Sequence, residues 1–145
     1  MLGDTIGPLS GSSRCSISDP CGRSHPRRET MIKAISLLVR KPGMTHEQFV
    51  KHWLEIHGPL ALKVSAIRRY VQSHIVDERR RPDIPPIGVE IDGIAELWYD
   101  DRDTMTRALA SPEMKALHAD GALFIGRIQS YLVEEKTITC DGGSA

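Results

Sequence analysis

Residues 45–61 read T-H-E-Q-F-V-K-H-W-L-E-I-H-G-P-L-A, and this segment predicts an amphipathic helix with a marked start and end. Thr45 is a favourable N-cap, and Gln48 stands three residues later, where it completes a capping box. Apolar residues recur at helical spacing and form one face, which comprises Phe49, Val50, Trp53, Leu54 and Ile56. The Gly-Pro pair that follows His57 is a typical stop signal. We therefore expect His57 to be the last helical residue, at the rim of whatever the helix packs on.

The composition is that of an ordinary globular protein. The chain has 145 residues, of which 40% are hydrophobic and 26% charged, and this length predicts one domain. The net charge is zero, so charge gives no argument for nucleic acid or an anionic membrane as a partner. No apolar run approaches the roughly 18 residues that a membrane-spanning helix needs. An odd set of cysteines without framework spacing favours a reducing cytoplasm: Cys15, Cys21 and Cys140.

The N-terminal part of the chain has a different texture. Residues 1–30 are rich in glycine, serine and proline and contain few large apolar residues. Such a segment buries too little apolar surface to offset the entropy of ordering it, so we expect a disordered leader. Alternatively, the natural protein begins at Met31 and the leader is an extension of the reading frame. We expect a folded domain over residues 31–138 and a flexible tail over residues 139–145.

Hydrophobic periodicity predicts a strand, a helix, two strands, a helical region and a last strand. The strand-like segments are residues 32–40, 68–78, 91–100 and 127–138. The helical region after the third strand is predicted to start at Asp101 or Asp103, to run to Leu109, and to restart at Ser111 and continue to about Ile125. This order is the split βαβ arrangement of a ferredoxin-like α+β fold, with a four-stranded antiparallel sheet.

Helices on one side of such a sheet leave the other side bare. In the second strand, one face carries Tyr70, Gln72 and His74. In the third strand, one face carries Asp92, Ile94, Glu96 and Trp98. The opposite face of the third strand has small residues, which would let a helix approach closely: Gly93 and Ala95. A bare face with aromatic residues such as Tyr70, Trp98 and Tyr131 predicts a homodimer in which two sheets face each other and enclose a pocket.

The segment between the second and third strands is predicted to be a loop. Residues 79–89 contain three arginines and three prolines, and proline is excluded from the interior of a sheet. The run of Arg79, Arg80 and Arg81 is either part of a solvated loop or a binding site for an anion.

Several segments together resemble the EthD-like proteins of the dimeric α+β barrel superfamily. The resemblance rests on K-P-G-M-T-H-E-Q-F, W-L-E-I-H-G-P-L-A, Y-V-Q-S-H, D-G-I-A-E-L-W-Y and A-L-A-S-P-E, between Met31 and about Ile138. The first strand and helix are also similar to the methylmuconolactone methylisomerase branch. The resemblance implies the ferredoxin-like fold and a homodimer. It implies a reaction only weakly, because function depends on the site and not on the scaffold.

The predicted site gathers on the bare face of the sheet. Candidate catalytic residues are His57, Tyr70 and His74, because an imidazole can act as acid or base near neutrality and a phenol can donate a hydrogen bond to an enolate. Candidate substrate-binding residues are Trp53, Asp92, Glu96, Trp98 and Phe124. We predict no metal and no organic cofactor, because metal-ligand spacings, phosphate loops and dinucleotide motifs are absent from the sequence.

Simpler interpretations remain open for each of these residues. His57 can merely cap a helix, and Tyr70 and His74 can pack at an interface. Asp92 can be a strand-end residue, Glu96 can pair with an arginine across the dimer, and Trp98 can be core or interface. His46 and His52 are expected on the polar side of the helix, in contact with solvent. His52 and His57 stand about 140° apart on an α-helix, so they are not expected to share a face.

The leading functional hypothesis is a cofactor-free isomerase, cyclase or lyase that acts by acid–base chemistry on a small cyclic carbonyl compound, such as a lactone or a polyketide-like molecule. Members of the superfamily that catalyse such reactions without a cofactor support this hypothesis by resemblance. A non-catalytic accessory or ligand-binding role in an oxygenase pathway, as for the ether-degradation proteins that name the family, is one alternative. Haem or oxidoreductase chemistry, as in other dimeric α+β barrel proteins, is another.

Overall fold

The computed structural model describes residues 31–139. Residues 31–136 lie in one compact unit, and residues 137–139, which belong to a second unit, contain no helix or strand. The predicted leader, residues 1–30, and residues 140–145 of the predicted tail lie outside the described residues.

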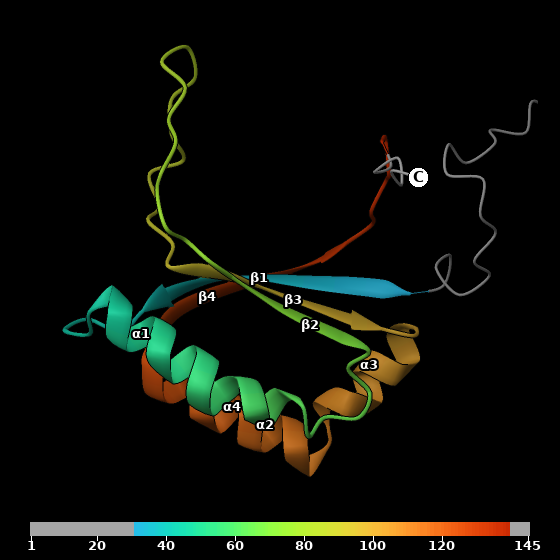
Figure 1. The fold of residues 1–145 in the computed structure, drawn as a ribbon. Coiled ribbons are helices and arrows are strands. Elements are labelled where there is room, and N and C mark those ends of the chain that lie inside the picture. Colours follow the sequence, from blue (N-terminus) through green and yellow to red (C-terminus); the bar gives the residue numbers. More distant parts are fainter. Residues whose placement is uncertain (1–30, 140–145) are drawn as a thin grey trace, which may run out of the picture. The chain divides into compact units, whose positions relative to one another are not determined.

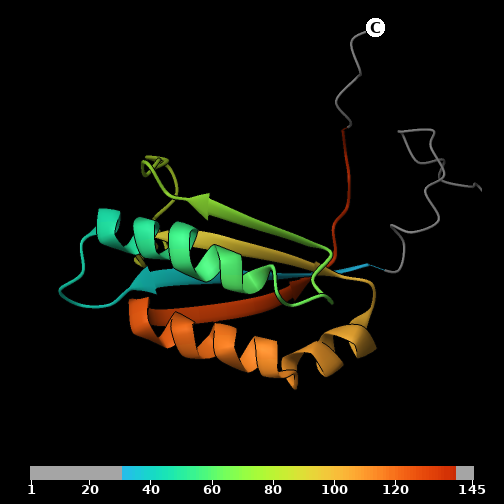
Figure 2. The same ribbon diagram turned by 60° about the horizontal axis from the view of Figure 1, so that its bottom comes forward.

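The compact unit has the predicted ferredoxin-like α+β fold. Its elements are β1 (Ile32–Arg40), α1 (His46–His52), the π-helical turn η1 (Trp53–His57), α2 (Gly58–Ala61), β2 (Arg69–His74), β3 (Gly93–Tyr99), α3 (Arg102–Leu109), α4 (Pro112–Phe124) and β4 (Ile125–Val133). The strands form one sheet in the order β2-β3-β1-β4, and every neighbouring pair is antiparallel. All helices lie on one side of this sheet (Figures 1 and 2). Among the described residues, no helix has the length and apolar character needed to cross a membrane.

The helix starts follow the local sequence. The backbone N–H of Gln48 donates to Oγ1 of Thr45 at 3.1 Å, and the Gln48 side chain accepts from the backbone N–H of Thr45 at 2.9 Å. This is the predicted capping box. Asp101 caps α3 and Ser111 caps α4, in each case by accepting a hydrogen bond from the backbone N–H three residues later.

The predicted end of the first helix at His57 is wrong. The helical path continues through Gly58 and Pro59 to Ala61. The backbone N–H of Gly58 donates to the carbonyl of Trp53, five residues back, instead of four. A proline inside an α-helix clashes with the carbonyl four residues before it, and the wider π turn directly before Pro59 lets the chain continue. Such single turns occur frequently at functional sites.

The core fills the space between the helices and the sheet. Its largest fully buried side chains are Trp53, Phe49, Phe124, Leu38 and Met114. Gly93 on β3 allows the helix layer to approach, because a Cβ there would lie 2.8 Å from Cη2 of Trp53 and closer still to Cζ3. This confirms the predicted role of the small residues on that face of the third strand.

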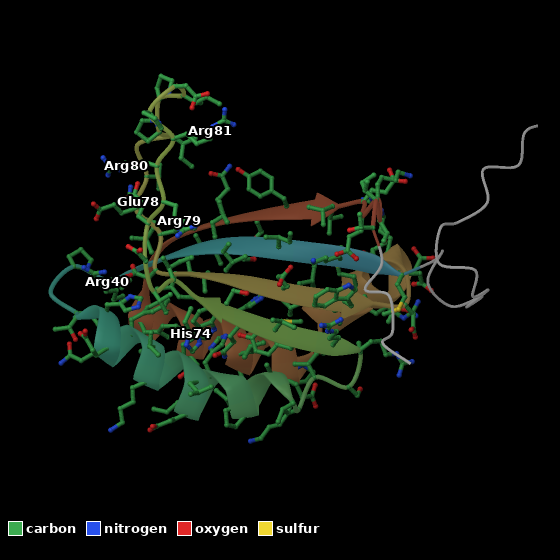
Figure 3. All side chains as sticks on the ribbon, turned by 45° about the horizontal axis from the view of Figure 1, so that its top comes forward. Arg40, His74, Glu78, Arg79, Arg80 and Arg81 are labelled. Atoms are coloured by element: carbon green, nitrogen blue, oxygen red, sulfur yellow. The ribbon has the colours of Figure 1, made fainter. Side chains whose placement is uncertain are left out.

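The loop between β2 and β3 rises from one end of the sheet, on the side away from the helices (Figure 1). Figure 3 shows Arg79, Arg80 and Arg81 along it. Arg80 pairs with Glu78, and Arg81 pairs with Asp83, within the loop. These side chains are exposed, as the solvated-loop interpretation predicts.

Candidate functional site

The predicted site residues do not converge on the bare face of the sheet. Tyr70 and His74 do share a face, as alternation predicted, but that face is the one the helices cover. Nε1 of Trp53 donates to the Tyr70 hydroxyl at 2.8 Å, and the His74 ring lies 5.0 Å from the Trp53 ring. His57 is also on the helix side, against α4. The pairing of Tyr70 with Leu97 explains the difference, because it puts Tyr70 on the buried face of β3.

Glu96 and Trp98 are on the opposite, uncovered face. Glu96 pairs with Lys33 of its own chain, and the Lys33 ammonium and the Arg69 guanidinium lie 4.5 and 4.7 Å from the centre of the Trp98 ring. Such cation–π contacts stabilise an exposed aromatic ring. The sheet therefore separates these two residues from the histidines, and they do not form one site with them.

Asp92 is a strand-end residue, as the simpler interpretation proposed. It directly precedes β3, is 5% exposed, and accepts hydrogen bonds from the backbone N–H of Arg40 at 2.8 Å and from Nδ1 of His46 at 2.9 Å. It also pairs with the Arg40 guanidinium. Burial opposes ionisation, but these bonds outweigh it and lower the pKa of Asp92. Asp92 thus links the β1–α1 turn to β3. His46 is bonded to this carboxylate and is not the purely solvated residue that the sequence predicted.

His57 is buried and has one engaged nitrogen. Its Nδ1 lies 2.8 Å from Oδ2 of Asp120, and its ring meets the Phe124 ring edge-on with centroids 5.1 Å apart. No hydrogen bond joins Nε2 to any described residue. Every buried side-chain nitrogen or oxygen of residues 31–139 has a hydrogen-bond partner, so Nε2 keeps some accessible surface. Burial lowers the pKa of His57 against the opposing effect of Asp120, with smaller lowering effects from His52 and His118. The imidazole is therefore neutral at neutral pH.

A second histidine shares the same carboxylate, contrary to the predicted solvated position. Nε2 of His52 lies 3.0 Å from Oδ1 of Asp120, and its ring stacks on Phe124 with centroids 4.7 Å apart. Asp120 was not among the residues predicted from the sequence. Its signal is its position on the apolar face of α4 with Leu117 and Phe124, because an acid among buried apolar residues needs a partner.

Tyr70 belongs to a chain of hydrogen bonds along β2. Nε2 of His74 lies 3.0 Å from the Gln72 amide oxygen, and the Gln72 amide nitrogen donates to the Trp53 carbonyl at 2.8 Å and to the Tyr70 oxygen at 3.3 Å. The Tyr70 oxygen thus accepts from Gln72 and Trp53, so its own O–H remains available as a donor. Burial raises the pKa of Tyr70, which keeps the phenol protonated at neutral pH.

The remaining predicted residues, Trp53 and Phe124, are part of the core, and two hollows in the surface lie away from the histidines. Trp53 and Phe124 are fully buried core residues that contact the histidines. One hollow of about 350 Å³ is lined by Arg40, Asp92 and Arg127 among others, and another of about 220 Å³ lies between Val64 and Arg107. Neither is lined by His57 or Tyr70. Within residues 31–139, no group of histidine, cysteine and acidic side chains could hold a metal ion.

Comparison with known proteins connects this arrangement to a family. A curated protein from Pseudomonas reinekei, 4-carboxymethyl-4-methylbutenolide mutase, is 27% identical over 106 residues, which are 72% of this chain and 98% of that protein. An EthD family protein from Bacillus halodurans has a similar structure, with 27% identity, a TM-score of 0.59 and coverage of 74% of this chain and 100% of that chain.

A more distant structure shares only the fold. A dimeric protein of unknown function with a ferredoxin-like fold, from Bacteroides fragilis, is 18% identical with a TM-score of 0.52, over 72% of this chain and 96% of that chain. The model of the EthD domain family matches residues 41–128, which include the helix that carries His57, the whole of β2 and β3, and Asp120. The chain therefore belongs to the EthD domain family.

Proposed function

We propose that this chain is an isomerase-type enzyme acting on a small lactone, with His57 as general acid and base. The butenolide mutase supports the substrate class, because this chain aligns with nearly all of it at 27% identity. The observation that carries the proposal is the state of His57, whose Nδ1 contacts Asp120 while Nε2 remains without a partner among the described residues. A neutral, oriented imidazole of this kind can accept a proton at neutral pH.

The proposed reaction moves one proton within the substrate. Nε2 of His57 takes a proton from the CH₂ of the carboxymethyl group, the electron pair of that C–H bond forms a C=C bond to C4, and the C4–O bond of the lactone breaks, which leaves negative charge on the lactone oxygen. The O–H of Tyr70 donates to that oxygen as negative charge develops. The carboxylate of the former carboxymethyl group then forms a C–O bond to C3, and the protonated His57 returns its proton to C2, the carbon next to the original lactone carbonyl, which gives the isomeric lactone. The balance needs no oxidant or reductant.

Two of the three predicted catalytic residues have these direct roles. His74 acts through Gln72, whose amide it holds against Tyr70. Trp53 and Phe124 contribute the apolar surroundings of the histidines and Tyr70. The proposal assigns no role in the reaction to Asp92, Glu96 or Trp98, because they lie at the end or on the far face of the sheet.

The test follows the proton directly. The purified chain is incubated in D₂O with 4-carboxymethyl-4-methylbutenolide, the compound in the relative's name, and NMR follows both the isomer and deuterium uptake next to the carbonyl. A positioned acid/base typically contributes roughly 10²–10⁴-fold, so His57→Gln should lose that factor. Lys115→Gln, at an exposed position of α4, is the control and should keep wild-type activity.

Two results would overturn the proposal. One is neither isomer nor deuterium uptake with the wild-type protein. The other is full activity in His57→Gln. Lactone binding that survives His57→Gln without any turnover would favour the alternative role as a ligand-binding protein.

We also propose that the chain acts as a homodimer. The relative from Bacteroides fragilis is described as dimeric, and the uncovered face of the sheet offers the surface, because it carries Trp98 and Tyr131, the latter 47% exposed. Two such faces packed together would remove these side chains from water.

A further inference from the structure

Asp120 is a buried carboxylate that two histidines share. It lies on α4, is 9% exposed, and each of its oxygens has its own imidazole, with Oδ2 at 2.8 Å from Nδ1 of His57 and Oδ1 at 3.0 Å from Nε2 of His52. The two rings use different nitrogens to reach the same side chain. Phe124 contacts both rings, edge-on for His57 and stacked for His52, and thus packs against the pair.

The π turn makes this sharing possible. On a regular α-helix, His52 and His57 would stand about 140° apart, and one carboxylate could not reach both. In η1 the hydrogen bond closes over five residues, from Gly58 to Trp53, so one turn contains an extra residue and positions five apart move toward the same side. Pro59, which makes the wider turn favourable, is thus linked to the geometry of the histidine pair.

We propose that Asp120 is a positioning residue that fixes opposite tautomers on the two histidines, with the proton on Nδ1 in His57 and on Nε2 in His52. The physical reason is that a carboxylate offers only acceptors, so each imidazole nitrogen that contacts it must carry a hydrogen. In a neutral imidazole the other nitrogen then has the lone pair. For His57 that nitrogen is Nε2, the accessible one. Asp120 therefore selects one of the two neutral tautomers of His57, the one in which the accessible Nε2 is the basic nitrogen.

The role in catalysis rests on the proposed function, but the tautomers do not. Asp120→Asn tests both, because an amide keeps the shape and replaces one acceptor oxygen with a donor NH₂ group. It can accept from one imidazole only, and the other must present a lone pair. One of the two histidines therefore has to change its tautomer.

The direct experiment is ¹⁵N NMR of the ring nitrogens in the wild-type protein, which needs no variant to fold. We expect at neutral pH a protonated Nδ1 and an unprotonated Nε2 for His57, and a protonated Nε2 for His52. Asp120→Asn should change the tautomer of at least one of them. Asp92→Asn is the matched control, since Asp92 is similarly buried and contacts His46 instead, and should leave both signals unchanged. His57 protonated on Nε2 in the wild type would overturn the proposal.

The kinetic experiment separates positioning from folding. Asp120→Asn should lower kcat by roughly 10²-fold or more with little change in KM, because a wrong tautomer removes the base and leaves the substrate contacts in place. The pH profile of kcat should shift as well, since Asp120, His52 and His118 are the charged or titratable groups that act on His57. A folded Asp120→Asn protein with the altered tautomer of His57 and wild-type kcat would overturn the positioning role. If the wild type shows no turnover, the proposed function fails, while the NMR result still decides the tautomers.

Discussion

The free energy of unfolding should depend on pH through His57 and His74, and the direction of this dependence follows from their pKa shifts. Burial lowers the pKa of both residues, with Asp120 opposing the shift at His57 and His46 adding to it at His74. In the unfolded chain they titrate near the ordinary value of 6.5. Below that pH the unfolded state binds more protons than the folded state, so the free energy of unfolding falls as the pH falls.

Urea denaturation at a series of pH values checks this expectation. The midpoint should be steady above pH 6.5 and fall below it, down to the folded pKa of each histidine. His57→Gln should flatten the slope in that window, whatever its effect on stability at neutral pH. Asp92 affects stability in a separate, more acidic pH range. Its pKa in the folded protein is lowered from 3.8, so the stability contributed by its ionised carboxylate is lost only below that pH. An unchanged slope in His57→Gln would contradict the depressed pKa of His57.

Tyr70→Phe should affect both stability and turnover. The substitution removes the acceptor of the Trp53 indole N–H, and a buried donor without a partner costs about 1–3 kcal/mol. It also removes the O–H proposed to donate to the substrate oxygen on which negative charge develops, and the loss of one such donor costs roughly 10²–10³-fold in kcat. Tyr131→Phe, at an exposed position, is the control. If Tyr70→Phe loses stability in urea denaturation but keeps wild-type kcat, Tyr70 has only a structural role.

The site was partly predictable from the sequence. The Gly-Pro pair that follows His57 marked this residue as a candidate, and the alternation of side chains along the strand correctly placed Tyr70 and His74 on one face of the sheet. Alternation does not reveal which face the helices cover, because that depends on the register between β2 and β3. Asp120 acquires its role through contacts with residues more than sixty positions away, and no local pattern reports such a partner.

At the scale of elements, helix starts were predicted well and one helix end was not. The caps of α1, α3 and α4 are local hydrogen bonds between residues three apart, so the sequence contains all the information they need. The course of the chain through Pro59 depends on a change of hydrogen-bond register and on the burial of Ala61 in the core beyond it. Tertiary packing here outweighs a local stop signal.

The contact between Trp53 and Gly93 gives a prediction about the helix and sheet layers. Gly93→Ala would place a methyl group against the buried indole and 3.1 Å from the Ser73 carbonyl. Overpacking of this kind typically costs about 1–3 kcal/mol. The free energy of unfolding from urea denaturation should fall accordingly.

Gly121→Ala is the matched control for that experiment. A Cβ at this helical position meets Ile125 at 3.5 Å and His57 at 3.6 Å, which are ordinary contacts. Replacing glycine inside α4 should leave stability unchanged or raise it by up to about 1 kcal/mol, because alanine favours the helix. Equal effects of the two substitutions would contradict the close approach at Gly93.

At the scale of the whole molecule, the order of elements was predictable because strand and helix periods differ and turn signals separate them. The ferredoxin-like topology followed from that order. The composition of the uncovered face was less evident. Lys33 and Arg69 stack on Trp98, and Glu96 pairs with Lys33, so this face combines aromatic surface with satisfied charges. Aromatic residues and arginine, such as Trp98 and Arg69 here, are enriched at interfaces between subunits.

The proposed homodimer can be tested by one substitution on that face. Ile35 stands in the middle of β1, opposite Glu96 on one side and Tyr131 on the other, and alternation puts it on the uncovered face with Lys33. In the single chain, Ile35→Lys places a cation beside the Glu96 carboxylate, and such a pair is favourable on an exposed sheet face. In a dimer, the two facing sheets would have to bury the added charge, and burial of a charge is costly.

Sedimentation over a dilution series should show a dimer for the wild type and a monomer for Ile35→Lys. Leu62→Lys, at a position 81% exposed beyond α2, is the control and should remain dimeric. A wild-type monomer at every concentration would contradict the homodimer, and a dimer that tolerates Ile35→Lys would place the interface elsewhere.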